Sequence, residues 1–357
     1  MEDGCQGKSK ASGDRRRLEL MQLSEKSDRK WSLLRLALPL VAAVAVTTSI
    51  ARAETYPARP ITLIVPFVAG GAADSTGRIL ADAMAKHLNG SIAVENIGGA
   101  GGAIGTARVK NAAPNGYTIG LGHMGTHAAA VPINPKLPYD PRTDFDYLGL
   151  ISTSPNVVYV RKDFPGDTLK EFIDYAKSKK SNMTMGHGGI GAASHVACVM
   201  LFQLIDVEPT LIAYRGFGQT ANDLLAGRID GGCDLLASVA PQAQAGNLKI
   251  LAVAADERSP TVPNAPTSKE AGLPAFKTET WTGLYVPKGT PEPIQAQLRD
   301  AIAKSLADPA VQKRLADIGA SLPKRDQLGG AYMKGLIDRE VRQWTEILTK
   351  ANVKLDQ

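Results

Sequence analysis

One stretch, residues 61–88, constrains the fold more than any other because it combines a strand, a glycine turn and a helix start. Its first five residues are apolar and mostly β-branched, which predicts a buried strand. Gly70 and Gly71 then permit a tight backbone turn. Asp74 is expected to cap the helix that follows, whose apolar residues recur at helical spacing.

This arrangement favours an anion-binding site. The first N–H groups of a helix have no acceptor within the helix, and the positive end of the helix dipole lies behind them. A carboxylate or a phosphate is the kind of ligand that such groups bind. The same residues also fit an ordinary strand–helix turn, so this stretch alone leaves both interpretations open.

The formal net charge of +6 is concentrated at the N-terminus. Residues 1–53 hold ten Lys and Arg against six Asp and Glu, whereas the remainder holds 31 against 29. A phosphate-binding surface needs a basic block, and the nearly neutral remainder offers none. We therefore expect no nucleic-acid partner.

The N-terminal segment has the three parts of a secretory signal peptide. Basic residues precede an apolar core at residues 36–46, and Ala51-Arg-Ala53 follows it. A membrane-spanning helix needs about 20 apolar residues, so this core is too short for one. We expect residues 1–53 to be an N-terminal extension and signal peptide cleaved after Ala53. Because the basic region is long, Met21 is an alternative start to Met1.

Two cysteines, Cys198 and Cys233, remain after the predicted cleavage. Two thiols in an oxidising compartment can form a disulfide. A pair of buried free thiols fits the sequence equally well, and both alternatives stay open.

Strands and helices alternate through the rest of the chain, which predicts parallel sheets built from βαβ units. Two extended pieces, at residues 147–151 and 156–160 and separated by residues 152–155, are expected to run out of one α/β lobe into the next. A long extended segment at residues 276–286 is expected to cross back. We assign residues 54–153 and 278–357 to lobe 1 and residues 154–277 to lobe 2. A cleft between two lobes is a common site for a small ligand.

Two patterns resemble cofactor or metal motifs without completing them. The glycines between Gly98 and Gly105 do not follow the G-x-G-x-x-G spacing, and no G-x-x-x-x-G-K-[ST] occurs. His123 and His127 are four residues apart but lack the glutamate of H-E-x-x-H. We therefore expect neither a nucleotide cofactor nor a metal, and interpret these histidines as the polar lining of a loop.

Two further patterns could suggest catalysis. Ser194 follows a glycine loop, yet no G-x-S-x-G surrounds it, and an N-cap that faces the first glycine turn is the better interpretation. Asp230 and Asp234 could act as acid and base. Because glycines lie between them, we interpret them as a strand end instead.

With these motifs placed, the chain resembles the Bug family, the extracytoplasmic solute receptors of tripartite tricarboxylate transporters. The resemblance covers essentially all of residues 54–357. It rests on six motifs in order: Pro66-Phe-x-x-Gly-Gly-x-x-Asp74, Asn96 to Gly105, Asn115-Gly-Tyr-Thr118, Tyr214-Arg-Gly216, Asp223-Leu-Leu-x-Gly227 and Val286-Pro-Lys-Gly-Thr-Pro291.

The resemblance implies an α/β, type II periplasmic-binding-protein (Venus flytrap) fold with two lobes and a ligand cleft. It implies a monomeric periplasmic receptor, without enzymatic activity or cofactor, that passes a small carboxylated solute to membrane permease subunits. Loop 66–74 and the loop before Ser194 would grip one carboxylate. Ala192 occupies a position where relatives commonly have serine. A hydroxyl contact to the ligand is therefore either missing here or supplied by Ser194.

The candidate ligand-binding residues are Phe67, Gly70, Gly71, Asp74, His123, Thr126, Gly189, Ser194, His195 and Asp234. Asp74 is our first choice for the residue that contacts the far group of the ligand, with simple N-capping as its alternative. Two other functions remain open at this point: an exported α/β hydrolase acting on a small carboxylate ester or amide, and a ligand-binding sensor component.

Overall fold

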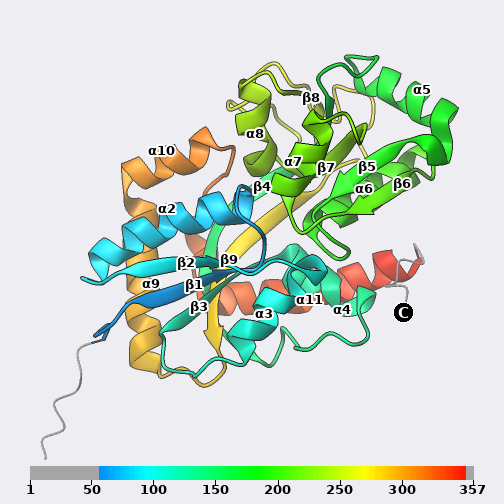
Figure 1. Ribbon diagram of the computed structural model, residues 1–357. Helices are drawn as coiled ribbons and strands as arrows, with labels where there is room; N and C mark the ends of the chain where they lie inside the picture. Colours follow the sequence, from blue (N-terminus) through cyan, green and yellow to red (C-terminus); the bar gives the residue numbers. More distant parts are fainter. Residues whose placement is uncertain (1–55, 351–357) are drawn as a thin grey trace, which may run out of the picture. The chain divides into compact units, whose positions relative to one another are not determined.

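The computed structural model describes residues 56–350. The predicted signal peptide, its cleavage site after Ala53 and the alternative start at Met21 lie outside these residues. The expected alternation of strands and helices is present (Figure 1). The elements are β1 (Ile61–Val65), α2 (Ala72–His87), β2 (Ile92–Asn96), η1 (Ala100–Gly102), α3 (Ala103–Lys110), β3 (Thr118–His123), η2 (Gly125–Ala129), α4 (Ala130–Ile133), β4 (Phe145–Arg161), α5 (Leu169–Lys179), η3 (Lys180–Asn182), β5 (Thr184–His187), α6 (Ala193–Ile205), β6 (Thr210–Ala213), α7 (Phe217–Leu225), β7 (Gly231–Leu235), α8 (Leu236–Gln244), β8 (Leu248–Val253), β9 (Glu279–Pro287), α9 (Glu292–Ala307), α10 (Pro309–Asp317), η4 (Arg325–Gln327) and α11 (Gly330–Lys350).

Within the described residues, nine strands are hydrogen-bonded in the order β2-β1-β3-β9-β4-β7-β5-β6, with β8 also paired to β4. The first sheet region comprises β1, β2, β3, β9 and the beginning of β4. The second sheet region comprises the end of β4 with β5, β6, β7 and β8. β1 is parallel to β2 and β3, and β5 is parallel to β6 and β7, as the βαβ alternation predicts.

β4 runs without a break through both sheet regions. The two extended pieces predicted from the sequence, separated by residues 152–155, are wrong because β4 is one strand of 17 residues. It pairs with β9 as far as Pro155 and with β7 from Asn156 onward. Proline cannot donate to a β-ladder, so the point where β4 changes partners is a position that tolerates it. The lobe boundaries at 153/154 and 277/278 stay a prediction.

Helices cover both faces of each sheet region (Figure 1). In the first region, α2, α9 and α10 share one apolar cluster, whereas α3, α4 and α11 pack on the opposite face. In the second region, α5 and α6 cover one face and α7 and α8 cover the other. None of the described helices is long and apolar enough to cross a membrane.

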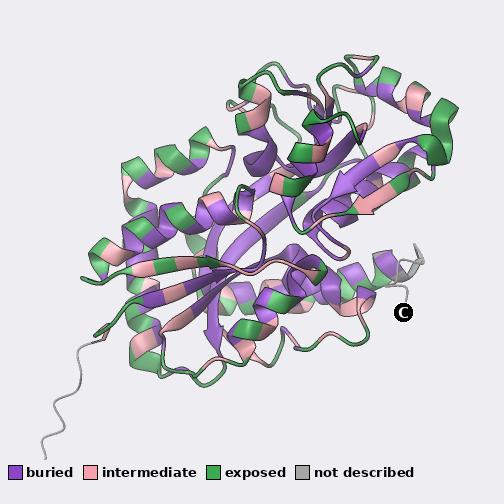
Figure 2. Ribbon diagram, in the orientation of Figure 1, coloured by how far each residue is buried: buried purple, intermediate pink, exposed green. Residues whose placement is uncertain are grey.

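The side chains of β4 show how the two faces are filled. Val158 and Val160 lie in the cluster of α5 and α6, whereas Val157 and Tyr159 lie in the cluster of α7 and α8. Successive strand residues point to opposite faces, so a continuous apolar run fills both cores at once. Figure 2 shows the result: the central strands are buried, whereas the edge strands β2 and β6 consist of intermediate and exposed residues.

The helical segments α8 and η2 are among those that the sequence-based prediction lacks. α8 contains Pro241, which removes a helical hydrogen bond and favours a helix break. The segment after His123 is a π-helix, η2, rather than the loop we predict there. Both segments carry Gly or Pro, and tertiary packing overrides their low helix propensity.

Cys198 on α6 and Cys233 on β7 are both buried, and neither forms a disulfide. The structure therefore contains the second of the two alternatives that the sequence leaves open, a pair of buried free thiols.

The start of α5 offers a test of local stability away from the cleft. The Thr168 hydroxyl accepts a hydrogen bond from the Glu171 N–H (3.2 Å), and the Glu171 carboxylate accepts one from the Thr168 N–H (3.0 Å). Loss of such a cap costs about 1 kcal/mol. We expect Thr168→Ala to lower the melting temperature by about 2 °C. Ser178→Ala, on the exposed side of the same helix, is the control, and equal melting temperatures would contradict the prediction.

Candidate functional site

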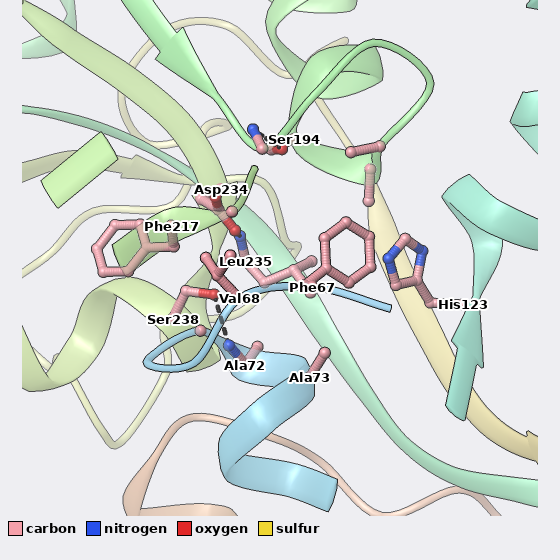
Figure 3. Close-up of a pocket in the computed structure, with 15 residues that line it drawn as sticks. Phe67, Val68, Ala72, Ala73, His123, Ser194, Phe217, Asp234, Leu235 and Ser238 are labelled. Carbon is pink, nitrogen blue, oxygen red and sulfur yellow. Dashed lines mark hydrogen bonds between the residues drawn. The ribbon is translucent and has the colours of Figure 1, made fainter. Parts of the chain in front are cut away.

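A small cavity of about 40 Å³ lies where the two sheet regions meet (Figure 3). The first region lines it with residues that follow β1 and end β3. The second region lines it with residues that follow β5, β6 and β7. The lining residues are Phe67, Val68, Gly71, Ala72, Ala73, His123, Gly188, Ala192, Ala193, Ser194, Gly216, Phe217, Asp234, Leu235 and Ser238.

Four helices begin at this cavity. The first helical residues of α2, α6 and α7 line it, and α8 contributes its N-cap Leu235 and the first-turn residue Ser238. Each helix start has N–H groups without an acceptor in the helix and a partial positive charge of roughly +0.5. Among the lining residues there is no lysine or arginine. The positive potential of this cavity therefore comes from backbone groups.

Asp74 is not the N-cap of α2, and its contact with the ligand stays a prediction. Gly71 is the N-cap of α2, so Asp74 lies inside the helix and the predicted N-cap is wrong. Its carboxylate accepts hydrogen bonds from Arg78 Nε (2.9 Å), Asn96 Nδ2 (3.0 Å) and the Gly70 N–H (3.1 Å). Burial acts to raise the pKa of Asp74, but these hydrogen bonds outweigh it and keep the pKa below its usual value. Asp74 thus fixes the loop after β1 and does not line the cavity.

The loop before α6 is held by its own side chains. The Ser194 hydroxyl accepts a hydrogen bond from the Gly188 N–H (2.9 Å), and His195 Nδ1 accepts one from the Gly191 N–H (3.3 Å). Ser194 does line the cavity, but Ala192 is the N-cap, so the predicted capping role of Ser194 is wrong. His195 and Gly189 are buried beside the cavity without lining it.

His123 and Phe67 form one wall. Their rings are stacked at 4.9 Å with an interplanar angle of 16°. His123 Nδ1 accepts the Gly125 N–H (2.9 Å), which fixes this nitrogen as an acceptor. Thr126 is fully buried, and its hydroxyl donates to the His123 carbonyl oxygen (3.1 Å). Thr126 therefore holds the turn that carries His123 and is not itself part of the lining.

Direct contacts join the two regions beside the cavity. The Ala72 N–H, in the first turn of α2, donates to Ser238 Oγ on α8 at 2.9 Å (Figure 3). A Cβ added to Gly101 would overlap the Ile190 carbonyl oxygen, and one added to Gly218 would lie 2.7 Å from the Ala69 carbonyl oxygen. Only glycine allows these backbones to approach so closely.

The structure thus places Phe67, Gly71, His123, Ser194 and Asp234 of the predicted residues on the cavity. Gly70, Asp74, Thr126, Gly189 and His195 support the loops around it. Ser238, Phe217 and Val68 line the cavity and are absent from the prediction. Ser238 lies on α8, whose proline hides the helix from sequence patterns, and Phe217 follows the Tyr214-Arg-Gly216 motif, a signal that could have found it.

Four buried histidines make the protein sensitive to acid. Burial lowers the pKa of His123 and His195 to about 4 and that of His127 and His187 to about 3. An unfolded histidine has a pKa near 6.5, so the unfolded state binds more protons below that pH. Stability is therefore lost as the pH falls from 6.5 toward 4. Asp234 and Glu340, whose pKa burial raises to about 7, act in the opposite direction but are only two.

His127 is the histidine best suited to test this linkage. Its ring lies among Tyr139, Phe145, Tyr147 and Tyr285, and its Nε2 has no hydrogen-bond partner in the described chain. The free energy of unfolding falls as the pH is lowered from 6 to 4. We expect this fall to be less steep in His127→Phe than in the unchanged protein, by up to about 1.4 kcal/mol per pH unit. Chemical denaturation at several pH values measures this slope.

The exposed histidine of α2, His87, provides the control for that measurement. His87→Gln should leave the slope as it is in the unchanged protein, because this side chain is exposed in the folded state as well. A slope that is the same in all three proteins would contradict the role of His127.

Comparisons with known proteins agree with this geometry. A family described as "Tripartite tricarboxylate transporter family receptor" matches residues 76–353. MatC from Rhodopseudomonas palustris, solved with bound malate, is 40% identical, with a TM-score of 0.79 over 82% of this chain and 100% of its own. The periplasmic binding protein BugD is 37% identical, with a TM-score of 0.81 over 84% of this chain and 100% of its own.

A second R. palustris protein, solved with adipate, is 29% identical, with a TM-score of 0.80 over 84% of this chain and 100% of its own. These matches confirm the fold class, the family resemblance and the prediction that the chain is a receptor rather than an enzyme. The protein belongs to the tripartite tricarboxylate transporter receptors, a family of periplasmic solute-binding proteins.

Proposed function

We propose that this protein captures a small carboxylate in the cavity and delivers it to the membrane permease subunits of a tripartite tricarboxylate transporter. The observation that carries the proposal is the convergence of four helix N-termini on a cavity without a lysine or arginine in its lining. Backbone N–H groups at helix starts bind carboxylates. The relatives solved with malate and adipate support the same ligand class.

Neutral donors suit a receptor that must also release its ligand. An arginine–carboxylate pair buried in a closed site would be both tight and geometrically rigid. N–H groups with partial charges bind the anion without a second full charge that must be desolvated. The apolar walls formed by Phe67, Val68 and Phe217 limit water and so strengthen the attraction.

In this proposal the contacts beside the cavity exist only when two lobes are closed. Lobe 1, residues 54–153 and 278–357, carries Gly101 and the start of α2, and lobe 2, residues 154–277, carries Ile190 and Ser238. Closure around a ligand would form the Ala72–Ser238 hydrogen bond and bring Gly101 against Ile190. The closed form would then be recognised by the permease.

The hydroxyl of Ser194 does not have the surroundings of a catalytic nucleophile. Such a serine needs a base within hydrogen-bond distance. Within residues 56–350, its hydrogen bond comes from the Gly188 N–H, and the neighbouring His195 Nδ1 accepts from Gly191. This arrangement holds a loop and does not favour hydrolysis.

The direct test is thermal unfolding of the purified protein with a panel of small mono-, di- and tricarboxylates, their amides and their amines. A ligand at 100 times its dissociation constant adds about 2.7 kcal/mol, which raises the melting temperature by several degrees. We expect a carboxylate to do so and to remain chemically intact. If no carboxylate stabilises the protein and an amide or ester is consumed, the protein is an enzyme and not a receptor.

A pair of glycine variants tests whether closure is needed for binding. Gly101 and Gly246 both have positive φ, at 63° and 70°, so alanine strains the backbone similarly at both. Only at Gly101 would the new Cβ meet another backbone, that of Ile190, whereas nothing lies within 4 Å at Gly246. We expect Gly101→Ala to weaken carboxylate affinity at least about tenfold relative to Gly246→Ala. Equal affinities measured by calorimetry would contradict the closure contact.

A further inference from the structure

Asp234 is the one aspartate or glutamate among the residues that line the cavity, and no lysine or arginine lines it. The residue is buried, with only 7% of its surface exposed. Figure 3 shows it between Ser194 and Ser238, facing the same space as Phe67 and Ala72. An ionised carboxylate in this position would repel the carboxylate that the helix starts attract.

The position of Asp234 is fixed by the start of α8. Its Oδ1 accepts a hydrogen bond from the Leu235 N–H at 2.8 Å. Ser238 Oγ accepts the Ala72 N–H, so the hydrogen of this hydroxyl is free to point toward Asp234. The Leu235 N–H occupies Oδ1, so we assign Oδ2 to the ligand.

We propose that Asp234 is protonated in the ligand-bound state and donates a hydrogen bond from Oδ2 to the second carboxylate of a dicarboxylate ligand. This inference rests on the proposed function and names the ligand class: a dicarboxylate without an amine. One proton from the solvent joins the ionised Asp234 as the ligand binds. The neutral carboxyl group then donates its O–H to a carboxylate oxygen of the ligand, and release of the ligand returns the proton.

Burial of this carboxyl group supports the proposal. Desolvation raises the pKa of Asp234 to about 7, although the Leu235 N–H and Ser238 act to lower it. A ligand carboxylate beside it raises this pKa further, since a like charge disfavours ionisation. The proton is therefore taken up near neutral pH, where the carboxyl groups of a free dicarboxylate are already ionised.

Among the described residues, the histidines near Asp234, Tyr159 and Cys233 keep their charge between pH 6.5 and 9. Burial lowers the pKa of the histidines of β3, β5 and α6 to about 4 or below and raises that of Tyr159 and Cys233 well above the usual value. On α2, the charged groups Asp74 and Arg78 form an ion pair with each other at 2.9 Å. Proton uptake on binding in this pH range therefore belongs to Asp234.

The test is calorimetric titration with malate, and with adipate, between pH 6.5 and 9 in buffers of different ionisation enthalpy. Above pH 7.5, we expect the dissociation constant to rise about tenfold per pH unit, with close to one proton taken up per ligand. In Asp234→Asn the side-chain amide N–H is a hydrogen-bond donor that does not titrate. The affinity of this variant for the dicarboxylate should therefore vary by less than about twofold over the same pH range. This asparagine variant should bind more tightly than the unchanged protein at pH 9.

Glu340→Gln is the matched control. Glu340 is a half-buried carboxyl group whose pKa is also raised to about 7, but it accepts a hydrogen bond from Trp281 (2.7 Å) and does not line the cavity. Binding of the dicarboxylate to Glu340→Gln should have the same pH dependence as binding to the unchanged protein. If Glu340→Gln abolishes the dependence and Asp234→Asn retains it, the assignment to Asp234 is wrong.

The outcomes separate this inference from the proposed function. Tight binding of malate or adipate without proton uptake overturns the inference and leaves the receptor intact. Preference for aspartate over malate at pH 8.5, without proton uptake, also overturns it, because an ammonium group would then pair with ionised Asp234. If neither dicarboxylate binds but another carboxylate in the panel does, the ligand class is wrong, and only failure of every carboxylate rejects the receptor.

Discussion

The direction of the parallel strands is the constraint on which the rest of this structure depends. In a strand–helix unit, the helix begins beyond the carboxyl end of the strand, so parallel strands bring their helix starts to one edge. β1 leads to α2, β5 leads to α6, and β6 leads to α7 in this way. Two such edges meet at the cavity. The proposed anion site is thus a consequence of topology and needs no basic side chain.

This origin of the positive potential explains how the two acidic residues are used. Asp74 lies near the start of α2, but its charge is matched by Arg78 and by amide donors, so that it organises the loop. Asp234 lies at the start of α8, where no cation accompanies it. A carboxyl group is stabilised by a helix dipole in both places. Only the second one faces the space that the ligand would occupy.

Most of the elements could be predicted from the sequence because apolar periodicity and turn residues agree with each other. Strand β1 has the predicted bounds, since a short, mostly β-branched run that ends before a glycine turn allows few alternatives. The helix start at Ala72 could not be predicted, because Asp74 has the residue type of a cap while its partners Arg78 and Asn96 depend on tertiary structure. α8 could not be predicted either, because Pro241 lowers the local helix propensity. Packing of Leu236 and Val239 stabilises the helix in spite of this proline.

Sequence patterns locate some residues of the candidate site but not those whose position depends on tertiary contacts. Phe67, Gly71 and Ser194 belong to recognisable motifs, so sequence patterns locate them. Ser238 has no motif, and its contact with Ala72 joins residues 166 positions apart. Such a contact depends on how the two sheet regions meet, which no local pattern encodes.

The pairing of β4 with β9 has a mechanical consequence. These strands pass between the sheet regions side by side, and they remain hydrogen-bonded up to the pair formed by Pro155 and Glu279. Two separate linkers would bend independently and allow the halves to twist in several directions. A two-stranded ribbon is stiff within its own plane and flexible only across it. In the proposed opening and closure, this ribbon would restrict the motion to one swing axis and would return the helix starts to the same alignment at each closure.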